Sequence, residues 1–161
     1  GIPFRLVPGV TAGVGGLGYA GIPVTHRDVN HAVTFVTGHM AGGDVPENLD
    51  WPSIAKGSPV IVLYMAMSHL GAISKLLIEN GRRADEPVAL VRNATLKDQS
   101  VLETTLGNAA EDVARADFKA PAIIVIGDVV KLREGLDWLG ALEGRILKRD
   151  PLGLRGIEDA V

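Results

Sequence analysis

Apolar residues in this chain form several short runs of strand length, separated by polar or small residues. A continuous run of about four to eight apolar residues is typical of a strand that is buried on both faces of a sheet. Alternation of apolar and polar positions, as at 100–106, is typical of a strand with one solvent-facing side. The pattern predicts strands at 4–7, 33–36, 59–64, 87–92, 100–106 and 122–126.

Between the predicted strands, the pattern changes to helical spacing. In the clearest case, apolar residues recur three or four positions apart, at Leu70, Ile73, Leu76 and Leu77. Gly81 follows in a position suited to end that helix. The predicted helices occupy 13–20, 51–55, 68–80 and 108–116. Residues expected to cap a helix N-terminus are Thr11, Ser68, Asn108 and Asp128.

Strands separated by helices in this way imply right-handed crossovers and an α/β fold. We expect residues 1–29 to be the end of an N-terminal α/β domain with a linker, and 30–143 to form a complete second α/β domain. That domain would contain a roughly five-stranded mixed sheet. The tail at 144–161 has no clear period, so we expect it to be partly disordered or to pack on a partner subunit. We expect the glycine-rich stretch at 38–43 to be a mobile loop.

Composition removes several function classes. The chain has 161 residues, of which 47% are hydrophobic and 4% aromatic, so its core is built from aliphatic side chains. A net charge of −3 gives no basic footprint for nucleic acid. The absence of cysteine excludes disulfides and thiolate metal sites and favours the cytoplasm. The longest apolar runs are of strand length, so we expect no membrane span and a soluble protein.

Four clusters of small residues lie where predicted strands give way to turns. Small residues at such positions let backbone N–H and C=O groups approach a ligand closely. These clusters therefore predict one pocket assembled from several strand ends. They are V-P-G-V-T-A at 7–12, Y-M-A-M at 64–67, N-A-T at 93–95 and A-P-A at 120–122.

The order of these clusters resembles the tetrapyrrole methylase family, from residue 1 to about residue 145. Further segments that carry the resemblance are P-G-V-T-A-G at 8–13, A-G-I-P-V-T-H-R at 20–27, V-T-F-V-T-G-H at 33–39, E-T-T-L at 103–106 and G-D-V-V-K-L-R at 127–133. Any one of them alone would be a weak signal, whereas together they are specific.

The resemblance implies two α/β domains with S-adenosylmethionine, the methyl donor, in the cleft between them. Thr11 and Ala12 would meet the donor from the first domain, and Met65, Ala94 and Ala122 from the second. S-adenosylhomocysteine would be the product of methyl transfer. The family members most similar to this chain methylate uroporphyrinogen III twice, giving precorrin-2 on the route to cobalamin and sirohaem, and such relatives form homodimers.

The chain departs from the family at its start. The family begins with a strand and a G-A-G-P-G-D loop and later carries a G-G-D-P segment, and neither occurs in this sequence. Residues 42–46 look superficially similar to the second but lie in the wrong order, so we interpret them as a loop. We therefore expect a C-terminal portion of such an enzyme, active only when the missing part is supplied.

The substrate of these relatives bears eight carboxylates, which would require basic or hydrogen-bonding groups at the cleft. His26, Arg27 and Arg92 are candidates for that role, although each could equally be a solvated surface residue. Met65 is interpreted as a pocket residue because of the resemblance, and Met67 as core.

Alternative interpretations remain open. The chain could be a non-catalytic dimerisation or ligand-binding module.

Residues 13–18 match the dinucleotide fingerprint G-x-G-x-x-G, but no strand directly precedes them, so a helix packed tightly on a sheet is favoured. The histidine spacings do not favour a metal site. Asp128 could be a catalytic carboxylate rather than a cap, but no acid–base partner is evident.

Overall fold

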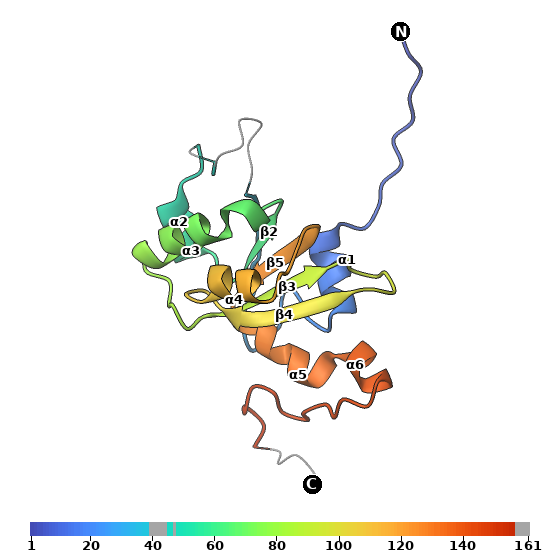
Figure 1. Cartoon of the computed structure of the whole chain (residues 1–161), viewed down its shortest axis with the longest axis vertical. Helices are drawn as coiled ribbons and strands as arrows, with labels where there is room; N and C mark the ends of the chain where they lie inside the picture. Colours follow the sequence, from blue (N-terminus) through green and yellow to red (C-terminus); the bar gives the residue numbers. More distant parts are fainter. Residues whose placement is uncertain (39–44, 47, 157–161) are drawn as a thin grey trace.

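The computed structural model describes residues 1–38, 45–46 and 48–156. Its centre is a five-stranded mixed sheet with the order β1-β2-β5-β3-β4, which confirms the predicted fold class (Figure 1). The strands are β1 (Thr34–Thr37), β2 (Ile61–Tyr64), β3 (Pro87–Arg92), β4 (Ser100–Thr105) and β5 (Ala122–Ile126). β1 and β2 run parallel, and every other pair is antiparallel.

Helices cover both faces of the sheet. The longer ones are α1 (Ala12–Tyr19), α2 (Trp51–Gly57), α3 (Leu70–Glu79) and α4 (Ala109–Arg115). A 3₁₀ turn, η1 (Met67–His69), precedes α3, and a second, η2 (Asp128–Leu132), leads into α5 (Arg133–Leu136) and α6 (Trp138–Leu142). One apolar core lies between the sheet and α2, α3 and α4, and the other lies between the sheet and α1 with η2.

The continuous apolar runs follow from these two cores. In β2, Ile61 and Leu63 point into the core under α2 and α3, whereas Val62 points into the core under α1. In β3, Leu90 lies in the core under α2 and α3, and Val91 lies in the core under α1. Because successive side chains of a strand point to opposite faces, a strand covered on both sides must be apolar at every position.

Strand pairing brings distant segments to one edge of the sheet. β5 lies between β2 and β3 and is antiparallel to both. The last residues of β2 and β3 therefore lie beside the first residues of β5. The helix α1 contacts β2 and β5 and begins at this same edge, where its first turn lies beside Tyr64.

Several predictions of local structure are wrong. Residues 4–7 form no strand, because no other described segment supplies the hydrogen bonds of a ladder, and they are exposed. Ser68 lies inside η1 and does not cap α3, whose N-cap position is His69. Asp128 is the first residue of η2, and Gly127 occupies the cap position.

The described part of the tail packs on its own chain, and the expected partial disorder or packing on a partner subunit stays a prediction. Residues 144–156 have no regular structure, yet they pack on α5 of the same chain. The Lys148 N–H donates to the Glu134 carbonyl oxygen at 2.8 Å, and Leu152 packs on the core beneath α1. The predicted mobile loop at 38–43 lies, except for Gly38, outside the described residues.

Candidate functional site

A cavity of about 760 Å³ opens at the edge of the sheet where β2, β3 and β5 meet α1. Its wall takes residues from all four small-residue clusters and from the turns beside them. The residues that line it are Ala12, Tyr64, Met65, Met67, Ser68, Val91, Asn93, Ala94, Leu96, Ala120, Pro121, Ala122 and Ile123. None of these is an Asp, Glu, Lys, Arg or His, so the part of the wall that the described residues form is uncharged and largely apolar.

The backbone at the rim adopts a conformation that L-residues rarely take. Met65, Asn93 and Thr95 have φ values of 51°, 48° and 72°, in the left-handed region. Such positions cost about 1–3 kcal/mol each and are concentrated at ligand-binding sites. At Met65 the chain turns sharply out of β2, and 63% of the residue stays exposed at the cavity.

The N-terminal turn of α1 forms one wall of the cavity. Thr11 occupies the N-cap position, but its side chain does not cap the helix. Its Oγ1 lies 2.5 Å from the Tyr64 hydroxyl, which also accepts a hydrogen bond from the Gly13 N–H at 2.9 Å. Tyr64 therefore connects the start of α1 to the end of β2.

Two glycines of α1, Gly13 and Gly16, allow close packing, the interpretation that the sequence favours over a dinucleotide fingerprint. A Cβ at Gly16 would lie 2.8 Å from the Ala94 Cβ, and a Cβ at Gly13 would overlap the Tyr64 ring and hydroxyl. Either contact would be shorter than the contacts that Cβ atoms make in real proteins. The absence of a side chain at these two positions lets the helix lie directly against the strand ends.

Four of the five predicted binding residues line this cavity: Ala12, Met65, Ala94 and Ala122. The fifth, Thr11, lies beside it through the contact with Tyr64. Met67, interpreted as core, both lines the cavity and packs against the core under α3. Sequence reasoning did not single out Tyr64, Asn93 or Leu96, although the first two stand within the small-residue clusters.

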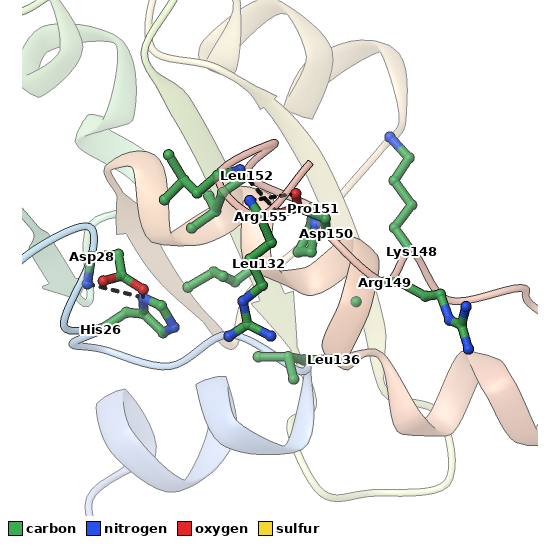
Figure 2. A pocket seen from close by; sticks show the side chains of 12 residues that line it. His26, Asp28, Leu132, Leu136, Lys148, Arg149, Asp150, Pro151, Leu152 and Arg155 are labelled. Carbon is green, nitrogen blue, oxygen red and sulfur yellow. Dashed lines mark hydrogen bonds and ion pairs between the residues drawn. The ribbon is translucent and has the colours of Figure 1, made fainter. Parts of the chain in front are cut away.

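The candidates for carboxylate binding are not brought to the cavity. Arg92 ends β3 without lining the cavity, and its buried Nε has no hydrogen-bond partner in the described part of the chain. Arg27 is exposed in the linker before β1. His26 lines a separate cavity of about 140 Å³, together with α5 and the tail (Figure 2).

This second cavity lies at the opposite end of the sheet. Leu132 and Leu136, which line it, follow the end of β5, whereas the larger cavity lies at the start of β5. In Figure 2 the His26 ring faces Asp28, with Nδ1 3.9 Å from the carboxylate, while Arg149 extends away from the two. His26 precedes β1, and β1 begins at the end of the sheet opposite the larger cavity.

Asp128 is engaged in ion pairs rather than in a catalytic arrangement. Its carboxylate lies 2.7 Å from Lys131 Nζ and 3.3 Å from Arg83 Nη2. Burial raises the pKa of this carboxyl, but the hydrogen bond and charge of Lys131, with those of Arg83, leave the pKa below its ordinary value. Asp128 therefore stays ionised and joins η2 to the turn before β3.

No group of three or more His, Cys, Asp or Glu side chains is arranged to hold a metal ion within residues 1–38, 45–46 and 48–156. In the same part of the chain, no helix has the length and apolar character needed to cross a membrane.

Comparison with known proteins agrees with the motifs. A family model described as Tetrapyrrole (Corrin/Porphyrin) Methylases matches residues 1–110. A uroporphyrinogen-III C-methyltransferase of Sinorhizobium sp is 62% identical over 154 residues, covering 96% of this chain and 55% of the relative. A sirohaem synthase of Stutzerimonas stutzeri is 44% identical over 138 residues, covering 86% of this chain and 29% of the relative. The chain thus spans about half or less of these relatives' length.

Solved structures share the fold. The uroporphyrin-III C-methyltransferase of Thermus thermophilus in complex with S-adenosylhomocysteine superposes with a TM-score of 0.68 at 30% identity, covering 81% of this chain and 55% of the other. A cobalt precorrin-4 methyltransferase superposes with a TM-score of 0.69 at 25% identity, covering 78% and 52%. Both structures therefore share the α/β fold of this chain.

Proposed function

The chain belongs to the tetrapyrrole (corrin/porphyrin) methylases, and from that premise we propose that it is the donor-binding part of an S-adenosylmethionine-dependent C-methyltransferase that acts on uroporphyrinogen III. The observation that carries the proposal is the 760 Å³ cavity at the strand ends. Its wall includes Ala12, Met65, Ala94 and Ala122.

The cavity fits an adenosyl ligand in size and chemistry. Pockets that bury small ligands usually have volumes of about 300–1,000 Å³ and mostly apolar walls. Alanines at 12, 94 and 122 leave backbone groups accessible to an adenine or ribose, because no long side chain covers them. Met65 and Leu96 provide apolar surface at the rim that would exclude water from a bound donor.

When bound, S-adenosylmethionine supplies an electrophilic methyl group on a sulfonium sulfur, which an electron-rich pyrrole carbon can attack. The chain's own residues need to align the two reactants and keep water out, because this step requires little acid–base machinery. The uncharged lining suits that role, because none of the described residues that line it carries a carboxylate or amine to compete for the methyl group.

The finer assignments belong to the same proposal. We place the product as precorrin-2, formed by two methylations, and the chain in the cytoplasm as a homodimer. The sirohaem synthase names of several relatives support a route towards sirohaem. The activity also needs groups for the substrate carboxylates, and in the described part of the chain no basic side chain lines the larger cavity.

Calorimetric titration of the chain with S-adenosylhomocysteine tests the proposal. We expect one site per chain with micromolar affinity, and transfer of labelled methyl from S-adenosylmethionine to uroporphyrinogen III by the complete enzyme. Binding by the chain with no methyl transfer by the complete enzyme would favour the alternative, a ligand-binding module. Preferential binding of NADH would contradict both and favour a nucleotide-binding role for residues 13–18.

A further inference from the structure

The Tyr64 hydroxyl lies between two segments that are far apart in sequence. It accepts a hydrogen bond from the Gly13 N–H at 2.9 Å and lies 2.5 Å from Thr11 Oγ1, across separations of 51 and 53 residues. The ring packs beside Phe35 of β1, with centroids 6.2 Å apart, and against Gly13. Tyr64 is half-buried, so these contacts are partly shielded from water.

The position of this hydroxyl matters because a helix N-terminus leaves N–H groups without partners. In α1 the cap side chain does not supply an acceptor, and the first turn contains no acidic residue. Four of the eight residues of α1 are glycine, which weakens the helix by about 1 kcal/mol each relative to alanine. The first turn of α1 therefore depends on the Tyr64 hydroxyl more than a helix with an ordinary cap would.

Tyr64 also stands next to the residues that shape the cavity. Ala12 lies between Thr11 and Gly13, the two residues that contact the hydroxyl, and it lines the cavity. Met65 follows Tyr64 directly and also lines the cavity, with a left-handed backbone. Fixing the hydroxyl against α1 thus fixes the distance between these two lining residues.

We propose that Tyr64 is a positioning residue for the methyl donor, whose hydroxyl clamps the first turn of α1 to the end of β2 and so holds the cavity walls in their binding geometry. This inference rests on the proposed function. Without the clamp, α1 would sample arrangements in which Ala12 is displaced, and the observed affinity would fall in proportion to the population of the competent arrangement.

The test compares the native chain with Tyr64→Phe, which removes only the hydroxyl. We expect the Gly13 amide to exchange with solvent at least tenfold faster in this variant, as measured by NMR, and the affinity for S-adenosylhomocysteine to fall about tenfold in calorimetry. Thr34→Val is the matched control, because the Thr34 hydroxyl contacts Ser58 Oγ at 2.6 Å at the other end of the sheet. We expect Thr34→Val to change neither the exchange rate of the Gly13 amide nor the affinity for S-adenosylhomocysteine.

A double-mutant cycle with Thr11→Val tests whether the two hydroxyls act together on donor affinity. If the two hydroxyls act as one clamp, the loss of donor affinity in the double variant Thr11→Val/Tyr64→Phe will be smaller than the sum of the losses in the two single variants. Additive effects would contradict the clamp. Circular dichroism of each variant checks that the sheet is intact.

The outcomes distinguish this inference from the proposed function. Unchanged Gly13 exchange in Tyr64→Phe would overturn the clamp, and faster exchange with unchanged affinity would overturn the positioning role. Failure of the native chain to bind S-adenosylhomocysteine would contradict the proposed function and with it the positioning role. The exchange measurement would then still report whether the clamp exists.

Discussion

Met65 combines an unusual backbone conformation with an exposed side chain at the larger cavity. Its left-handed backbone, with φ of 51°, turns the chain out of β2 and leaves 63% of the residue exposed. Methionine is among the residue types most often buried in folded proteins. Its exposure beside an apolar cavity is explained if a ligand covers it.

Replacing Met65 with alanine should therefore weaken donor binding without destabilising the fold. Covering a Met side chain contributes about 1.5 kcal/mol, which corresponds to about a tenfold loss of affinity for S-adenosylhomocysteine. Leu142→Ala is the control, because Leu142 is 78% exposed on α6 and does not line the cavity. Calorimetry of both variants checks this, and equal affinities for the two would count against the assigned site.

The glycines of α1 provide a second test at single positions. Gly16→Ala places a Cβ 2.8 Å from the Ala94 Cβ, so we expect the free energy of unfolding to fall by about 1–3 kcal/mol. Gly18→Ala meets no atom within 4 Å and should instead raise it by about 0.5–1 kcal/mol. Urea unfolding measures both, and a stabilising Gly16→Ala would show that the helix is not packed closely on the strand ends.

Local sequence patterns predict capping residues poorly in this chain. Thr11 and Asn108 occupy N-cap positions, yet neither side chain makes a capping hydrogen bond. The Thr11 hydroxyl instead meets Tyr64, and a local pattern contains no information about a residue 53 positions away. Asp50, which sequence reasoning did not name, caps α2 by accepting from the Ser53 N–H at 3.0 Å.

At the scale of elements, a buried ion pair joins α2 to the segment between α3 and β3. The Arg82 guanidinium pairs bidentately with the Glu86 carboxylate, and it donates to the Ser58 carbonyl at 2.6 Å and the Ala55 carbonyl at 3.2 Å. The side chains of Arg82 and Glu86 are 6% and 10% exposed. Breaking such a pair leaves a buried charge without compensation.

Arg82→Leu should lower the free energy of unfolding by about 3–5 kcal/mol, because Glu86 then remains buried and unpaired. The double variant Arg82→Leu/Glu86→Leu should recover part of that loss. Lys75→Ala is the control, since Lys75 pairs with Glu79 on an exposed surface and should change stability by less than about 0.5 kcal/mol. Chemical denaturation measures all three, and a double variant less stable than Arg82→Leu would contradict the argument.

Elements with strong apolar runs were predictable, and short irregular ones were not. The bounds of β3 and β5 match the sequence prediction to the residue, because charged residues, proline or glycine interrupt each run. The end of α3 was also predicted correctly, since Gly81 takes the left-handed conformation with φ of 102°. In contrast, α5 and α6 contain four and five residues, too few for a helical period to be visible.

At the scale of the whole molecule, the sequence predicts that the four small-residue clusters meet, but it does not predict the strand order that brings them together. The four small-residue clusters do converge, because β5 is antiparallel to both β2 and β3 and brings its start beside their ends. The strand order itself depends on long-range pairing, which no local pattern encodes. His26, a candidate for carboxylate binding at the cleft or for a surface position, lies at the opposite end of the sheet, before the start of β1.

A crystal structure of the chain grown with S-adenosylhomocysteine tests the central claim most directly. We predict that the ligand occupies the larger cavity, with its adenosyl group within van der Waals contact of Ala12, Met65, Ala94 and Ala122. Ligand bound instead at the cavity of His26 and the tail, or at neither cavity in a crystal that contains it, would contradict the account.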